Sequence, residues 1–211
     1  PGGDIGSLAV HGTVNDVAML GARPRFLSCG FILEEGLEID VLERIVASMA
    51  HAAQSAGVQI VTGDTKVVPK GAADKVFINT TGLGELLFDE PLSGSGARVG
   101  DAILISGTVG DHGLAIFSNR EGLSFETEVQ SDSAPLNHLI VKLLKKVPAA
   151  HVLRAPTRGG VATTVNEIAQ QSACECLLQE TGIPVSNHVR EGCSLLGLDP
   201  LYLANEGKFI C

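Results

Sequence analysis

Residues 58–68 read V-Q-I-V-T-G-D-T-K-V-V. The apolar start, Val58–Val61, predicts a short buried strand that runs directly into Gly63–Lys66. Strand ends that lead into glycine turns are where ligand groups collect in α/β-type sheets. There a carboxylate can hold a divalent cation, and a lysine can offset developing negative charge. A plain turn with a solvated lysine fits these residues as well, and is slightly favoured when they are taken alone.

Outward from this stretch, the sequence predicts helices in alternation with strands. The predicted helices are Ile5–Leu20, Asp40–Ala56, Leu114–Arg120, Leu136–Lys146, Val161–Gln171 and a last helix with Pro184 in its first turn that ends at Leu196. The predicted strands are Arg25–Leu33, Val58–Val61, Lys75–Leu86, Ala102–Ser106 and Cys174–Gln179, followed by a strand pair or bend over Tyr202–Cys211. Asp4 is the expected N-cap of the first helix, and Asp40 and Glu43 have capping-box spacing. Gly57 is the expected C-cap of the second helix.

The stretch 89–100 is rich in Gly, Pro and Ser and predicts a linker. We therefore expect two domains, residues 1–92 and residues 93–211, each built from helices and strands. The first half lacks a G-x-G-x-x-G turn and orders its elements strand, helix, strand, strand. This order favours an α+β fold over a dinucleotide-binding unit.

The composition excludes several classes of function. The 211 residues include 15 basic and 24 acidic side chains, a net charge of −9. Nucleic-acid binding is not expected, because phosphate backbones require dense Lys and Arg. No apolar run approaches the roughly 20 residues that span a bilayer, so membrane insertion is not expected either. The five scattered cysteines predict reduced thiols in a cytoplasmic protein.

Three further segments place polar groups where they could carry chemistry. Asn15 and Asp16 interrupt an apolar helix, where a carboxylate is costly unless it is exposed, paired or bound to a metal. The loop 156–160, P-T-R-G-G, precedes a helix, and its N–H groups with Arg158 would form an anion site. Glu206 lies between apolar stretches and would gain basicity by burial. A polar helix face, a glycine loop with a surface arginine and a turn glutamate are the alternatives, and the first and third are the commoner cases.

Taken together and in order, these motifs resemble one family. The segments are P-G-G-D-I-G at 1–6, H-G-T-V-N-D-V-A-M-L-G-A at 11–22, S-C-G-F-I-L-E-E-G at 28–36, V-T-G-D-T-K-V-V at 61–68, P-T-R-G-G at 156–160 and A-N-E-G at 204–207. Across essentially all 211 residues the chain resembles the HypE family of hydrogenase maturation factors, the carbamoyl dehydratases. Residues 14–22 and 61–68 are the most specific parts of the resemblance.

The resemblance implies a fold, a reaction and partners. The family is similar in fold to aminoimidazole ribonucleotide synthetase and selenophosphate synthetase, which are two-domain α+β proteins that dimerise through their N-terminal sheets and bind ATP and Mg²⁺ there. The implied reaction is the ATP-dependent dehydration of a carbamoyl group on the family's C-terminal cysteine. The resulting thiocyanate supplies the cyanide ligands of the [NiFe]-hydrogenase iron. The implied partners are a second copy of the chain, the carbamoyltransferase HypF and the HypC–HypD iron-carrying complex.

The resemblance also implies roles for individual residues. Those implied to bind the nucleotide or its magnesium are Asn15, Asp16, Gly63, Asp64, Thr65, Thr157 and Arg158. Among them, Asp16 and Asp64 are the implied magnesium ligands. Lys66 and Glu206 match the lysine and glutamate implicated in deprotonating the carbamoyl nitrogen.

The chain departs from the family pattern in three places. Ala155 stands where the family loop usually has Asp, which weakens the expected magnesium site. The family's N-terminal glycine-rich and T-D-S segments are absent, as is its C-terminal Pro-Arg-Ile-Cys tail, so we expect a chain truncated at both ends. Cys211 is expected to be a strand cysteine and is not assigned the acceptor role. The alternative functions are another ATP-dependent synthetase or kinase on the same fold, and a non-catalytic maturation scaffold.

Overall fold

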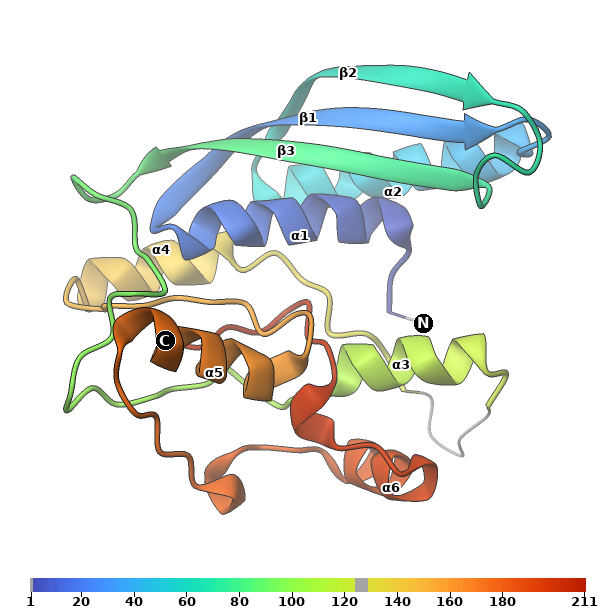
Figure 1. Ribbon diagram of the computed structural model, residues 1–211. Helices are drawn as coiled ribbons and strands as arrows, with labels where there is room; N and C mark the ends of the chain where they lie inside the picture. Colours follow the sequence, from blue (N-terminus) through green and yellow to red (C-terminus); the bar gives the residue numbers. More distant parts are fainter. Residues whose placement is uncertain (1, 124–128) are drawn as a thin grey trace. The chain divides into compact units, whose positions relative to one another are not determined.

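The computed structural model describes residues 2–123 and 129–211, which divide into two compact units (Figure 1). The sheet unit comprises Gly3–Asp89 together with Pro135–Lys142. The loop unit comprises the described residues of Glu90–Ala134 and Leu143–Cys211, with Gly2. The predicted boundary between 92 and 93 stays a prediction.

The sheet unit packs two helices on one face of a three-stranded sheet (Figure 1). Its elements are α1 (Ile5–Met19), β1 (Ala22–Glu34), α2 (Ile39–Ala56), β2 (Gln59–Val68) and β3 (Val76–Leu86). The strand order is β2-β1-β3, with β2 parallel to β1 and β3 antiparallel to it. The mixture of helices and sheet agrees with the predicted α+β class.

Local sequence signals fix the ends of both helices. Asp4 caps α1 by accepting the Ser7 N–H at 2.9 Å, and the Ser7 hydroxyl reciprocates as in a capping box. Gly57, with φ of 69°, ends α2 in the left-handed conformation that favours glycine. The predicted capping role of Asp40 is wrong, because Glu38 is the N-cap and provides no side-chain bond. Asp40 lies instead in the first turn, where the helix dipole favours a carboxylate.

The core of the sheet unit lies between β1 and the two helices. Its buried members are Val10, Val14, Leu27, Cys29, Ile45, Met49, Ala52, Ala53, Ala56 and Val58. Glycines on β3 allow α1 to approach the sheet closely, since a Cβ at Gly82 would lie 2.6 Å from a methyl carbon of Val17. Helix side chains and strand backbone therefore pack in direct contact.

The segment Pro135–Lys142 returns from much later in the chain to complete the sheet unit. Two buried asparagines hold it there. The Asn15 side-chain oxygen accepts the Leu136 N–H at 2.8 Å, and the Asn137 amide donates to the Ala56 carbonyl at 2.8 Å. This segment begins α4 (Asn137–Lys146), close to the predicted helix.

The loop unit holds α3 (Asp111–Arg120), α5 (Gly160–Ser172), α6 (Asn187–Leu196) and two short 3₁₀ turns, Glu180–Gly182 and Pro200–Tyr202. The predicted strands Ala102–Ser106 and Cys174–Gln179 are wrong, since neither forms a strand in this described part of the chain. Ile105 instead makes an isolated bridge with Ile210. Ser186 is the N-cap of α6, so Pro184 precedes the helix rather than lying in its first turn.

Candidate functional site

The motif at 61–68 lies inside strand β2 and not in a turn, so the predicted strand-to-turn junction is wrong. Gly63 pairs with Cys29 of β1, Asp64 with Gly30 and Lys66 with Ile32. The physical reason is steric. A Cβ at Gly63 would collide with the Cys29 carbonyl oxygen, so this glycine allows two strands to meet closely and the chain continues in extended form.

Strand β2 is exposed, which also corrects the prediction of a buried strand. Every residue of Gln59–Val67 is exposed, and β2 pairs with β1 on one side only. A bulge interrupts this pairing, because Leu27 faces Ile60 while the next residue, Ser28, faces Thr62. The strand therefore presents both its side chains and one backbone edge.

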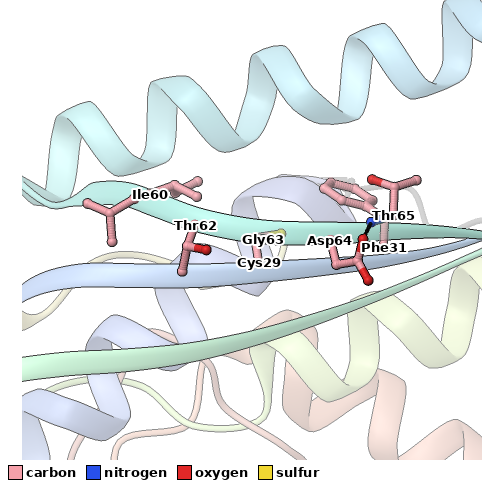
Figure 2. A pocket seen from close by; sticks show the side chains of 8 residues that line it. Cys29, Phe31, Ile60, Thr62, Gly63, Asp64 and Thr65 are labelled. Carbon is pink, nitrogen blue, oxygen red and sulfur yellow. Dashed lines mark hydrogen bonds between the residues drawn. The ribbon is translucent and has the colours of Figure 1, made fainter.

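Alternation along β2 separates the side chains that the sequence grouped together. Since successive side chains of a strand point to opposite faces, Asp64 and Lys66 share one face and Thr65 lies on the other. Figure 2 shows the Asp64 and Thr65 side chains pointing away from each other. The Asp64 carboxylate accepts the Thr65 N–H at 2.8 Å. Asp64 and Lys66, rather than Asp64 and Thr65, form the polar pair of this strand.

An open depression lies along β2 and its neighbour (Figure 2). Its lining residues are Cys29, Phe31, Ile60, Val61, Thr62, Gly63, Asp64 and Thr65. Burial raises the pKa of the Cys29 thiol, which therefore stays protonated at neutral pH. The depression is thus lined by the uncharged side chains of Cys29 and Phe31 from β1 and by both apolar and polar residues of β2.

Asn15 and Asp16 differ in their surroundings although they are neighbours on α1. Asn15 is 3 % exposed and holds the return segment through Leu136, so the structure gives it a packing role. Asp16 is exposed. An exposed helix carboxylate suits a magnesium ion that a nucleotide brings with it, since such ions take one or two carboxylates and complete their shell with phosphates and water.

Thr157 and Arg158 lie in the loop unit, directly before α5. The loop turns sharply at Gly159 and Gly160, with φ of 72° and 63°. A Cβ at Gly160 would collide with the carbonyl oxygen of Leu201, so the loop packs directly on the 3₁₀ turn. Arg158 is exposed and Thr157 half-buried at the start of a 13-residue helix. Both remain available to an anion there.

Asn205 is a functional candidate that the sequence did not single out. Its side chain is fully buried, and its oxygen accepts the Gly110 N–H at 2.8 Å. Its amide nitrogen donates to the carbonyls of Pro156 and Leu203, at 3.1 and 3.0 Å. Asn205 directly precedes Glu206, so its side chain ties the segment that carries Glu206 to the 156–160 loop and to Gly110. The available signal was an asparagine that follows an apolar stretch and directly precedes a candidate base.

Glu206 is half-buried, and its N–H donates to the Asp132 carboxylate at 3.0 Å. Lys66 belongs to the sheet unit and is exposed. The catalytic pairing of Lys66 with Glu206 stays a prediction, because each residue is placed within its own unit.

Among residues 2–123 and 129–211, no group of three or more His, Cys, Asp or Glu side chains gathers to hold a metal. Asp64 points to the sheet face away from the helices, because its partner Gly30 alternates with the core residues Cys29 and Phe31, so the structure does not bring it together with Asp16 of α1. The five cysteines are all free thiols. Cys211 pairs through its backbone with Leu104, at 2.9 and 2.8 Å. The helices described include none long and apolar enough to cross a membrane.

The chain is similar to known proteins along its whole length. Two family models match it: AIR synthase related protein, N-terminal domain, over residues 1–86, and its C-terminal domain over residues 98–211. The carbamoyl dehydratase HypE of Cupriavidus necator is 60% identical over 210 residues, which is 100% of this chain and 60% of the relative. The chain thus spans about 60% of the length of such curated relatives.

Solved structures show the same similarity in three dimensions. A crystal structure of hydrogenase maturation protein HypE in complex with ATP is 70% identical with a TM-score of 0.98, and the match covers 100% of this chain and 63% of that one. A chain in a HypE–HypF complex is 53% identical with a TM-score of 0.97, and covers 100% of this chain and 69% of that one.

Proposed function

Since the chain belongs to the AIR synthase related family and, within it, to the HypE hydrogenase maturation proteins, we propose that it takes part in the ATP-dependent dehydration of a cysteine-bound carbamoyl group. The product is a thiocyanate that supplies cyanide to the iron of a [NiFe]-hydrogenase. The observation that carries this proposal is the 60% identity to a carbamoyl dehydratase along the whole chain. It outweighs the alternatives of another synthetase or kinase on this fold and of a non-catalytic scaffold.

The chemistry has two requirements. The carbamoyl oxygen is a poor leaving group until it receives the γ-phosphoryl group of ATP, after which the C–O bond breaks and the oxygen departs with phosphate. The nitrogen must lose both of its protons as the C≡N bond forms. The protein must therefore align a phosphoryl group and provide a base near the nitrogen.

The exposed groups of the two units suit these tasks. In our proposal Asp16 on α1 and Asp64 on β2 each offer a carboxylate to nucleotide-bound magnesium, and their sequence neighbours Asn15, Gly63 and Thr65 belong to the nucleotide site. Thr157 and Arg158 bind phosphate oxygens at the start of α5. Magnesium, when bound, neutralises charge on the phosphates. The ATP complex of a 70% identical HypE protein supports nucleotide binding.

Glu206 acts as the base in this proposal, and Lys66 stabilises the negative charge that develops beside it. The half-buried position of Glu206, on a loop whose backbone the Asp132 carboxylate holds, is compatible with this role.

We further propose that the chain works in the cytoplasm with HypF, with the HypC–HypD complex and as a homodimer. A HypE–HypF complex among its relatives supports the first partner. The sheet face opposite the helices supports the homodimer, because it exposes large apolar side chains, namely Phe26, Ile32, Phe77 and Leu83. Such a face is covered most simply by its own copy. Sedimentation that showed a monomer at micromolar concentration would contradict this.

The decisive test is Glu206→Gln in the complete gene product. Because the amide keeps the shape but cannot accept a proton, cyanide formation should fall by roughly 10²–10⁴-fold while ATP binding persists. ATP hydrolysis with and without a carbamoyl donor separates the alternatives. A scaffold shows neither activity, and another kinase or synthetase hydrolyses ATP without responding to the donor. Normal cyanide formation by the variant would remove Glu206 from catalysis.

A further inference from the structure

We propose that Asp132 is a positioning residue for the candidate base, and that it sets the place of Glu206 by holding its backbone. This inference rests on the proposed function of Glu206. Asp132 belongs to no motif of the sequence analysis and lies 74 positions from Glu206 along the chain.

The contacts of Asp132 are unusual for an aspartate in a loop. Its side chain is only 5 % exposed. One carboxylate oxygen accepts the Glu206 N–H at 3.0 Å, and the Lys208 ammonium nitrogen lies 3.1 Å from the other. The second contact is an ion pair without hydrogen-bond geometry. A buried carboxylate is costly unless it is paired in this way, so the contacts with Glu206 and Lys208 are what make the burial of Asp132 possible.

The backbone of the two segments also meets closely. A Cβ at Gly207 would collide with the Asp132 carbonyl oxygen, so only glycine allows this approach. Asn205, directly before Glu206, is anchored by its side chain to the Pro156 carbonyl. Asp132 holds the Glu206 N–H and pairs with Lys208 two residues later. The candidate base therefore lies on a loop that is held from both ends.

The 131–133 segment has its own anchor, independent of Glu206. A ring nitrogen of His112, on α3, lies 2.8 Å from the Ser131 hydroxyl, which also accepts the Ser133 N–H at 3.1 Å. Asp132 therefore lies on a segment that is attached to α3. A fixed carboxylate can hold the glutamate loop in the geometry that proton transfer needs, and a shift of about 1 Å in such geometry costs up to roughly 10²-fold in rate.

The chemistry of this contact requires an acid and not an amide. The aspartate has an acceptor at each of its two oxygens, one for the Glu206 N–H and one facing the Lys208 cation. An asparagine side chain has one acceptor and one donor. In either orientation, the amide introduced by Asp132→Asn would place its NH₂ group against the Glu206 N–H or against the lysine.

The test uses the complete gene product carbamoylated by HypF, at saturating ATP and well below the unfolding temperature of every variant. Asp132→Asn should lower kcat for cyanide formation by about 10–100-fold, with KM for ATP unchanged within about twofold.

Adding Lys208→Met should restore most of kcat, because the amide oxygen is then free to accept the Glu206 N–H. Asp132→Ala with Lys208→Met has no acceptor and should stay slow. Asp101→Ala is the matched control in the loop unit, since Asp101 also accepts a backbone N–H and pairs with His151, and its kcat should not change.

The comparison of the two double variants keeps the test decisive even if Asp132→Asn does not fold. Both lack the buried ion pair, and only the asparagine variant keeps an acceptor for the Glu206 N–H. Equal kcat in the two double variants, or wild-type kcat in Asp132→Asn, overturns the role of Asp132. A wild-type protein that makes no cyanide overturns the proposed function instead, and the two failures are therefore distinct.

Discussion

The two units present their candidate residues in different ways. In the sheet unit, Asp16 and Asp64 project from a regular helix and a regular strand, and their side chains are exposed. In the loop unit, Thr157 and Glu206 lie on irregular segments, and buried polar side chains hold their backbone. The sheet unit positions its residues by repeating hydrogen bonds and apolar packing. The loop unit does so by single, specific contacts.

Because of this difference, a substitution at an exposed site residue of the sheet unit should change function without changing stability. A substitution at a buried polar residue of the loop unit should change both. Replacing an exposed polar side chain of a strand removes a chemical group and leaves the fold almost unchanged. Replacing a buried residue that bonds two loops removes the support of the site and part of the stability of the unit. Three substitutions, taken in order of their cost to the fold, test this contrast.

The largest cost is expected for Asn205→Ala in the loop unit. The substitution leaves the Gly110 N–H without its acceptor and the Pro156 carbonyl without one of its donors, and it opens a cavity at a fully buried position. We expect a loss of about 3 kcal/mol or more in the free energy of unfolding, measured by urea titration. Asn119→Ala, at an exposed position of α3, is the matched control and should change it by less than about 0.5 kcal/mol. A small loss at Asn205 would show that the loops of this unit do not depend on it.

The same contrast explains what the sequence could predict. The ends of α1 and α2 follow from Asp4 and Gly57, because a cap acts on its own neighbours. The strand β3 follows from its period-2 pattern. The roles of Asn205 and Asp132 depend on partners 49 and 74 positions away, and no local pattern contains them.

The errors at β2 and at 102–106 have a related cause. Apolar runs at Val58–Val61 and Ala102–Ser106 predicted buried strands, yet most of these residues are exposed. A run of apolar residues measures the preference for burial, whereas the exposure of a strand depends on which other segments cover it. The predicted conformation of residues 61–68 was wrong, because Gly63 serves the close packing of two strands and not a turn.

The second test, of intermediate cost, compares two glycines on neighbouring strands, Gly63 of β2 and Gly30 of β1. Gly63→Ala should destabilise the sheet unit by about 1–3 kcal/mol, because the new methyl group collides with the Cys29 carbonyl and forces β2 away from β1. Gly30→Ala, on β1, is the matched control, since its Cβ would meet nothing closer than the Asn79 oxygen at 3.9 Å. It should be neutral or slightly stabilising. Equal unfolding midpoints for the two variants would contradict the close approach of β2 to β1.

The smallest cost to the fold is expected for Asp64→Asn. The side chain is exposed on an edge strand, and the amide oxygen can still accept the Thr65 N–H, so the free energy of unfolding should change by less than about 0.5 kcal/mol. The lost charge matters only where a cation or a phosphoryl group is bound. If Asp64 is a magnesium ligand, magnesium-dependent ATP turnover should fall at least about tenfold and recover in part at higher magnesium, since weaker binding is overcome by concentration. Thr62→Val, two residues earlier on the same face of β2, is the control for a nearby change that removes no charge. Full ATP turnover by Asp64→Asn at low magnesium would place the metal elsewhere, and β2 would then serve the site without a metal ligand.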